Sequence, residues 1–325
     1  MSERAPTSPI WLLRIVLPGA SGRVVTSIAI LTLMVGWFWL AGTFETNAVD
    51  VSPSAALFFA TILAYIIPVF HYITEQTERA FDQLVPYVNA DADALESWRR
   101  GIREKTARSH ALTIGLGLAA WIAHTLLLYG TVPRIFQVID ATRIAFVFAP
   151  MFVWVSMITA IAGLVDNARL FRRLVPRTRI DLLAPASLTA FGRVAVISTL
   201  AMVGAQAAFP LLWIDTEQAL VTSLPGLLGT GAAMVALFVL PIMPAHRAIV
   251  AAKRAELERI ATHVAIERHA IERLEPHLVY RREIQRVSEW PFDSNIVTRL
   301  AFYLVIPPLT WLGAAVLDVF VERMM

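Results

Sequence analysis

The chain has no cysteine among its 325 residues, and only two of its basic residues are lysines. The lack of cysteine excludes disulfide bonds, thiolate metal sites and cysteine nucleophiles. Charged residues are also scarce, at 16% of the total, whereas hydrophobic residues make up 57% and the mean hydropathy is +0.62. This balance is typical of a membrane protein, so the net charge of +3 does not indicate nucleic-acid binding.

Several signatures of membrane function are missing as well. The apolar stretches hold no pair of carboxylates for a coupling ion, no arginine at every third position and no potassium-channel filter sequence. The chain has no HExxH motif and no cluster of histidines with metal-ligand spacing. We therefore expect no metal, no cofactor and no catalytic site. No internal repeat is evident, and an odd number of spans argues against two equal halves.

Apolar stretches long enough to cross a bilayer are the main feature of the chain, since a spanning helix needs about 20 residues. Seven are present, at residues 24–43, 54–75, 109–130, 143–165, 192–214, 220–243 and 299–320. We therefore predict an all-α fold, a polytopic membrane bundle of seven transmembrane helices. The first six spans pair into transmembrane hairpins over 24–75, 109–165 and 192–243, and the last occupies 299–325 with a short tail.

The positive charge lies almost wholly in alternate gaps between these stretches. Segments 1–23, 76–108, 166–191 and 244–298, with Arg193 and Arg299 beside them, hold 25 of the 28 basic residues. Positively charged loops stay in the cytoplasm, which predicts a cytoplasmic N-terminus and an outer C-terminus. The same segments are predicted to contact anionic headgroups of the inner leaflet. Abundant alanine and scarce lysine favour a prokaryotic chain, and hence the cytoplasmic (inner) membrane.

Three of the predicted cytoplasmic segments contain amphipathic helices. Pro9–Pro18 in segment 1–23 is too short to span and is expected to lie in the interface. Segment 76–108 predicts two helices separated near Pro86, the second beginning at Asn89 or Asp91. Segment 244–298 has an apolar seven-residue repeat, which fits either a helix packed on the protein's own loops or a stalk that meets other copies. The first interpretation is favoured because the repeat covers only about three heptads.

Small residues at helical spacing predict which spans pack most closely, because lipid gives helices no hydrophobic reason to associate. Span three carries a run of four, and spans five and six carry pairs at the same spacing. We expect these three helices to form the centre of the bundle. The run in span three comprises Ala111, Gly115, Ala119 and Ala123.

Two groups of polar residues are candidate functional sites. Tyr303, Pro307 and Thr310 share one side of the last span, where the Pro307-Pro308 pair should divide the helix, and Gln206 in span five is costly to bury without a partner. These four are candidate pore-lining residues. A second group, at the inner boundary, comprises His71, Asp166, Arg193 and Arg299.

Two functions fit these features about equally, and a third fits less well. The first is channel-like permeation of ions or small solutes by a homo-oligomer, favoured by the divided last span and the scarcity of coupling charges. The alternative is a non-transporting membrane subunit or signalling anchor that binds a protein partner through segment 244–298. An enzyme acting on lipid headgroups through His71 and Asp166 is the least supported of the three.

Overall fold

The computed structural model describes residues 6–44, 52–129, 141–183, 186–213, 219–267 and 271–291, and nearly all of them are helical. The α-helices are α1 (Trp11–Ile15), α2 (Ala20–Leu40), α3 (Pro53–Leu84), α4 (Ala92–Arg103), α5 (Ala107–Tyr129), α7 (Ala141–Leu174), α8 (Ala186–Gln206), α9 (Ala219–Glu267) and α10 (Ile271–Arg286). Three 3₁₀ turns and two short strands complete the described part: η1 (Val85–Tyr87), η2 (Val175–Arg177), η3 (Phe209–Trp213), β1 (Thr7–Pro9) and β2 (Glu104–Thr106).

Six helical segments are long and apolar enough to cross a membrane: Ser21–Leu40, Pro53–Tyr87, Ala107–Leu127, Ile144–Arg177, Thr189–Leu212 and Leu224–Ile266. They confirm the prediction of an α-helical bundle and indicate an integral membrane protein. The seventh predicted span, 299–320, lies outside the described residues. The count of seven and the orientation in the membrane therefore remain predictions.

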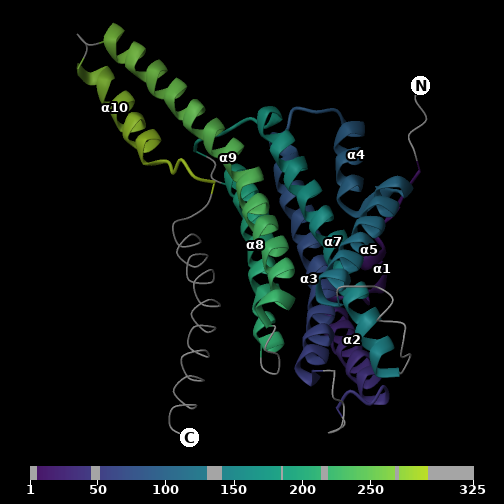
Figure 1. The fold of residues 1–325 in the computed structure, drawn as a ribbon. Helices are drawn as coiled ribbons and strands as arrows, with labels where there is room; N and C mark the ends of the chain where they lie inside the picture. Colours follow the sequence, from purple (N-terminus) through teal and green to yellow (C-terminus); the bar gives the residue numbers. More distant parts are fainter. Residues whose placement is uncertain are drawn as a thin grey trace, which may run out of the picture.

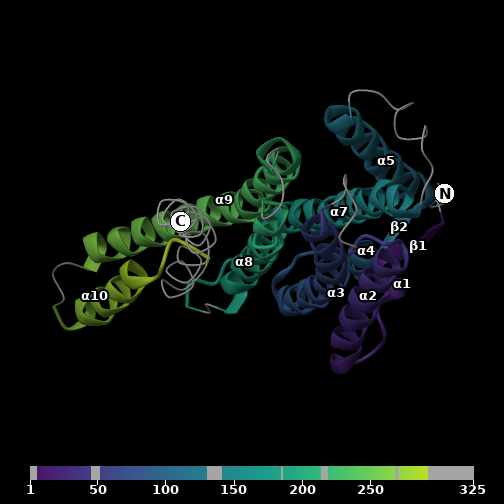
Figure 2. The ribbon, with the colours of Figure 1, turned by 60° about the horizontal axis from the view of Figure 1, so that its bottom comes forward.

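Helices α3 and α7 lie side by side in the bundle. Helix α2 packs on α3 and α5 packs on α7, while α8 contacts both α3 and α9. Figure 2 shows α7 between α5 and α3. Many of the bulky side chains of α3 are buried, among them Phe58, Phe70 and Ile73, so α3 supplies much of the core.

The predicted place of span three at the centre is wrong: in the described bundle α5 lies at the side, and its main contact is with α7. Ala111, Gly115, Ala119 and Ala123 are all exposed on α5. The contact with α7 is made instead at Gly117, where an added Cβ would lie 2.6 Å from the Cα of Val155. Small residues permit close approach, but they do not determine which face of a helix is used.

The N-terminal segment and α4 are tied to the same end of the bundle, which we call the basic end because the described parts of the four basic segments lie toward it (Figure 1). Strand β1 pairs with β2 in antiparallel register, Thr7 opposite Thr106. The predicted start of the second cytoplasmic helix is confirmed at Asp91, whose carboxylate accepts a hydrogen bond of 2.8 Å from the Ala94 amide. Helix α1 covers the middle of the predicted interfacial segment, and its Leu12 is fully buried.

At the basic end, α9 extends beyond its apolar part and α10 folds back on it, forming a hairpin that projects from the bundle (Figure 1). Tyr280 donates a hydrogen bond of 2.9 Å to Glu256 across the hairpin. The ammonium of Lys253 donates to the Val287 carbonyl at 3.0 Å. Most of segment 244–298 therefore packs against itself as a helical hairpin.

An internal repeat is present, although none was expected from the sequence. FDQLVPYVNAD at 81–91 and FRRLVPRTRID at 171–181 share Phe, Leu-Val-Pro and Asp at an offset of 90 residues. Both copies end a long spanning helix, continue as a 3₁₀ turn and then pair with each other. The side chains of the shared Phe and Leu of both copies are buried in one cluster.

The two copies are related by a local two-fold axis. Val88 and Thr178 form an antiparallel bridge. The backbone N–H of Asn89 donates to the backbone carbonyl of Arg177 at 2.7 Å, and the backbone N–H of Arg179 donates to the backbone carbonyl of Tyr87 at 2.8 Å. Residues 87 and 89 of the first copy correspond to residues 177 and 179 of the second, so each of these bonds is the counterpart of the other. The hairpins α2–α3 and α5–α7 thus end in equivalent turns that hold each other at the basic end.

Candidate functional site

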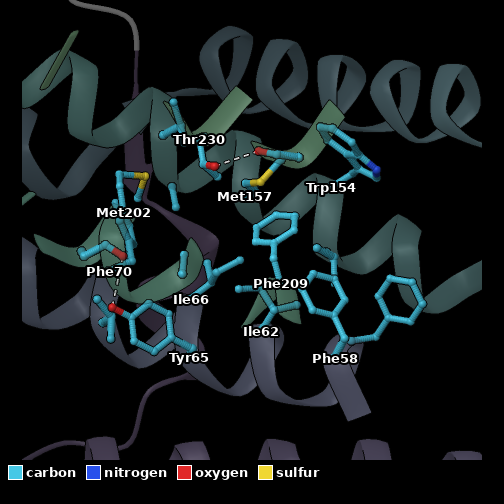
Figure 3. A pocket seen from close by; sticks show the side chains of 18 of the residues that line it. Phe58, Ile62, Tyr65, Ile66, Phe70, Trp154, Met157, Met202, Phe209 and Thr230 are labelled. Carbon is cyan, nitrogen blue, oxygen red and sulfur yellow. Dashed lines mark hydrogen bonds between the residues drawn. The ribbon is translucent and has the colours of Figure 1, made fainter. Parts of the chain in front are cut away.

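The described bundle contains a cavity of about 70 Å³ between α3, α7, α8 and α9, partly open at the bundle surface (Figure 3). Its wall along α3 runs from Phe58 to Ile73, about 22 Å at 1.5 Å per residue. Side chains that line it include Ile62, Tyr65, Ile66, Phe70, Trp154, Met157, Met202, Phe209 and Thr230. The cavity therefore lies at the depth of the membrane spans rather than at either end.

The spacing of the lining residues on α3 explains why this helix forms one wall. Phe58, Ile62, Ile66, Val69 and Ile73 follow one another at intervals of three or four positions, which places them on one helical face. The opposite wall comes from residues 150–164 of α7. The cavity thus lies between the second helices of the two hairpins that share the repeat.

Polar atoms in and beside the wall are engaged within the protein. The Tyr65 hydroxyl donates to the Ala201 carbonyl at 3.1 Å (Figure 3). The indole N–H of Trp154 donates to His124 Nδ1 at 3.0 Å. The Thr230 hydroxyl donates to the Gly226 carbonyl at 2.8 Å. A ligand would therefore meet few polar groups that lack a partner.

No carboxylate, ammonium or guanidinium group belongs to the described residues that line this cavity. Placing an ion there would remove its hydration without supplying an opposite charge, which is strongly unfavourable. An apolar cavity of this kind stays dry and accepts apolar molecules. Its chemistry is that of a hydrocarbon-binding site.

Of the four predicted pore residues, the structure places one. Gln206 is half-buried near the end of α8, and its amide nitrogen donates to the Thr230 hydroxyl of α9 at 3.2 Å. Gln206 thus lies beside the cavity. Tyr303, Pro307 and Thr310 are outside the described residues.

Of the predicted inner-boundary group, His71 and Asp166 lie beside different charged residues. His71 Nδ1 is 4.0 Å from the Glu75 carboxylate, which also pairs with Arg23 at 2.5 Å. Asp166 pairs with Lys105 at 3.1 Å and with Arg169 at 3.5 Å. Arg193 is exposed on α8, and Arg299 is outside the described residues.

Sequence reasoning missed the best-formed ion pair at this end, between Arg103 of α4 and Glu78 of α3. Its two hydrogen bonds measure 2.5 and 2.7 Å. The hydrogen bonds to Glu78 raise the pKa of Arg103, so the guanidinium stays protonated. Glu75, Glu78 and Asp82 recur at three- and four-residue spacing after the second span, and this pattern could have indicated an acidic face for α4.

In the part of the chain that the structure describes, no group of three His, Cys, Asp or Glu side chains could hold a metal ion. Comparison with family models, with curated proteins and with solved structures finds no match. The functional conclusion therefore rests on the geometry of the bundle.

Proposed function

We propose that the protein is an integral membrane protein that binds a hydrocarbon chain of a lipid in the cavity between its two related hairpins. The observation that carries this proposal is the charge-free wall at the depth of the spans. In this proposal the open side of the cavity faces the acyl chains of the bilayer. Lipid chains are therefore the apolar molecules present there at the highest concentration.

The length of the cavity supports a single acyl chain as the occupant. One leaflet supplies about 15 Å of hydrocarbon, half of the roughly 30 Å core. The wall between Phe58 and Ile73 covers about 22 Å. The lined length therefore accommodates the chain lengthwise, whereas the enclosed space of about 70 Å³ takes in only part of it and leaves the rest along the open side.

A substitution that fills the cavity tests the proposal of acyl-chain binding. Ala205 lines it and is only 4% exposed, so Ala205→Phe should occupy the space that the chain would take. We expect labelling of the purified protein by a photoreactive fatty acid to fall at least tenfold, because a loss of about 1.4 kcal/mol already weakens binding tenfold. Unlabelled palmitate should compete with the probe on the wild-type protein.

Ala232→Phe is the matched control, because Ala232 is exposed on the neighbouring helix α9. It adds the same ring outside the cavity and should leave labelling unchanged. Equal labelling of the wild type and Ala205→Phe would remove the proposal. Failure of palmitate to compete on the wild type would also remove it, whether or not the variant folds.

A second candidate is the channel-like permeation of ions or small solutes by a homo-oligomer. It is supported by the Gln206–Thr230 hydrogen bond, which places polar groups between α8 and α9 within the spans. In this proposal Tyr303, Pro307 and Thr310 of the predicted last span line the path together with Gln206. The protein would lie in a prokaryotic inner membrane.

Recordings from planar bilayers that contain the pure protein test the permeation proposal. Thr310→Leu should lower the conductance, because it removes a hydroxyl from the predicted path. Unchanged conductance would remove the pore assignment of the last span. A particle mass equal to one copy would count against the homo-oligomer.

The projecting α9–α10 hairpin favours a different role, a non-transporting subunit or signalling anchor that binds a protein partner through segment 244–298. In this proposal the hairpin reaches the partner away from the bundle (Figure 1). Co-purification of one fixed partner, lost when Ile266 and Val279 on the hairpin are changed to Glu, would support it. These two side chains are 74% and 51% exposed, so the changes should not disturb the fold. A pure homo-oligomer that retains conductance would contradict it.

A further inference from the structure

The paired turns η1 and η2 form an open groove at the basic end. Residues 86–89 line one side, and residues 176–179 line the other. The helical segments Pro53–Tyr87 and Ile144–Arg177 end at these turns. The predicted spans end at residues 75 and 165, about ten residues or roughly 15 Å before the turns, so the groove lies outside the hydrocarbon, on the side of the headgroups and the adjacent water.

Comparison of the two copies of the repeat shows which residues the turn requires and which it does not. The Phe, the Leu-Val-Pro and the Asp are shared by both copies. Where the first copy has Asp82, Gln83, Tyr87 and Asn89, the second copy has Arg172, Arg173, Arg177 and Arg179. Because the first copy forms the same 3₁₀ turn and the same bridge without arginine, folding of the turn does not account for these four residues.

The four arginines carry charge that the described part of the chain does not neutralise. All four are exposed, and none of them pairs with a carboxylate of a described residue. The acidic groups of the two copies are already engaged. Asp82 pairs with Arg99 at 3.1 Å, and Asp91 and Asp181 accept hydrogen bonds from the amides of Ala94 and Leu183. The groove therefore has a net positive charge.

The side chain of Arg177 is held by an aromatic ring of α4. Its guanidinium lies 5.0 Å from the centre of the Trp98 ring of α4. Stacking on an aromatic ring uses the face of the guanidinium and leaves its N–H groups free at the edge. These N–H groups match the oxygens of a phosphate, which arginine binds through two parallel hydrogen bonds. Arg179 lies on the same side of the groove, two residues further on.

We infer that the groove between η1 and η2 binds a phosphate group, with Arg177 and Arg179 as its main ligands. The phosphate belongs either to the headgroup of an anionic lipid or to a soluble phosphate compound. This inference is independent of the acyl-chain cavity, because the two sites lie at different depths and share no residue.

The test uses the full chain with Arg177→Gln and Arg179→Gln together. Native mass spectrometry of the detergent-solubilised protein measures adducts with phosphatidylglycerol and with phosphatidylcholine, and inorganic phosphate serves as a soluble competitor. We expect the double variant to lose at least tenfold in affinity for phosphatidylglycerol. Its affinity for phosphatidylcholine should be unchanged.

The control is the double change Arg281→Gln and Arg282→Gln on α10, which removes the same charge from exposed positions of the hairpin. It should bind phosphatidylglycerol within twofold of the wild type. Equal loss in both double variants would reduce the effect to general surface charge and overturn the inference. Wild-type binding in the groove variant would overturn it too.

Competition distinguishes the two sources of phosphate. If millimolar inorganic phosphate displaces phosphatidylglycerol from the wild type, the groove accepts soluble phosphate. If it does not, the lipid headgroup is the ligand. Trp98→Leu provides a second measurement that leaves every arginine in place. It should weaken phosphatidylglycerol binding several-fold by releasing Arg177 from its ring, and an unchanged affinity would remove the role of Arg177.

Discussion

Gly117→Leu is expected to destabilise the protein by about 3 kcal/mol, the upper range for overpacking a tight interior. Any side chain at this position meets backbone, since a Cβ would lie 2.6 Å from the Cα of Val155 on α7. Backbone cannot move aside as a flexible side chain can, so α5 must separate from α7. Thermal unfolding of the purified protein in detergent measures the effect.

Gly115→Leu is the matched control, two residues away on the same helix. A Cβ there has no neighbour within 4 Å. The substitution should change stability by no more than about 0.5 kcal/mol, as is usual for exposed positions. If both glycines tolerate leucine equally well, the contact between α5 and α7 is not the one described.

Phe171→Ala is expected to lower the free energy of unfolding by about 3–5 kcal/mol, the usual range for removing a buried phenyl ring. Phe171 is fully buried and meets the ring of Phe191 edge-on, with 6.0 Å between their centroids. Phe81 holds the equivalent position in the first copy of the repeat and is 1% exposed. Phe81→Ala should therefore cost a similar amount, and thermal unfolding of both variants tests the equivalence.

Arg172→Ala is the control for Phe171→Ala, because it also replaces a large side chain with alanine, at the neighbouring position. The Arg172 side chain is exposed and should be replaceable within about 0.5 kcal/mol. A loss of less than about 1 kcal/mol for Phe171→Ala would mean that the ring is not part of a packed core. A large difference between the two phenylalanine variants would instead argue against a shared structural role for the two copies.

Hydropathy was sufficient to predict the class of fold and six of the apolar segments. It could not predict where the helices end. Helix α3 continues to Leu84 and α9 to Glu267, well past their apolar parts. A helix continues beyond the hydrocarbon where packing and helix-forming residues support it, so an apolar stretch marks the buried length of a helix and not its full length.

The candidate sites were less predictable, because each is built from helices far apart in the sequence. The cavity joins α3 to α7, α8 and α9, and no local pattern shows which apolar faces meet around a void. Gln206 was singled out correctly as a residue that needs a partner, but Thr230 became that partner only in the fold. The repeat is different: its shared residues are visible in the sequence, but the two copies agree at only five positions of FDQLVPYVNAD and FRRLVPRTRID.

Helix α9 also has a mechanical consequence. It is one helix from Ala219 to Glu267, with Pro225, Pro241 and Pro244 inside it, and Thr230 near its start belongs to the cavity wall. From Pro244 to Glu267 it extends about 35 Å, so a tilt of roughly 10° at the bundle moves the tip of the hairpin by about 6 Å. A rigid tilt of α9 would therefore convert a small change in packing around the cavity into a larger displacement at the tip of the hairpin.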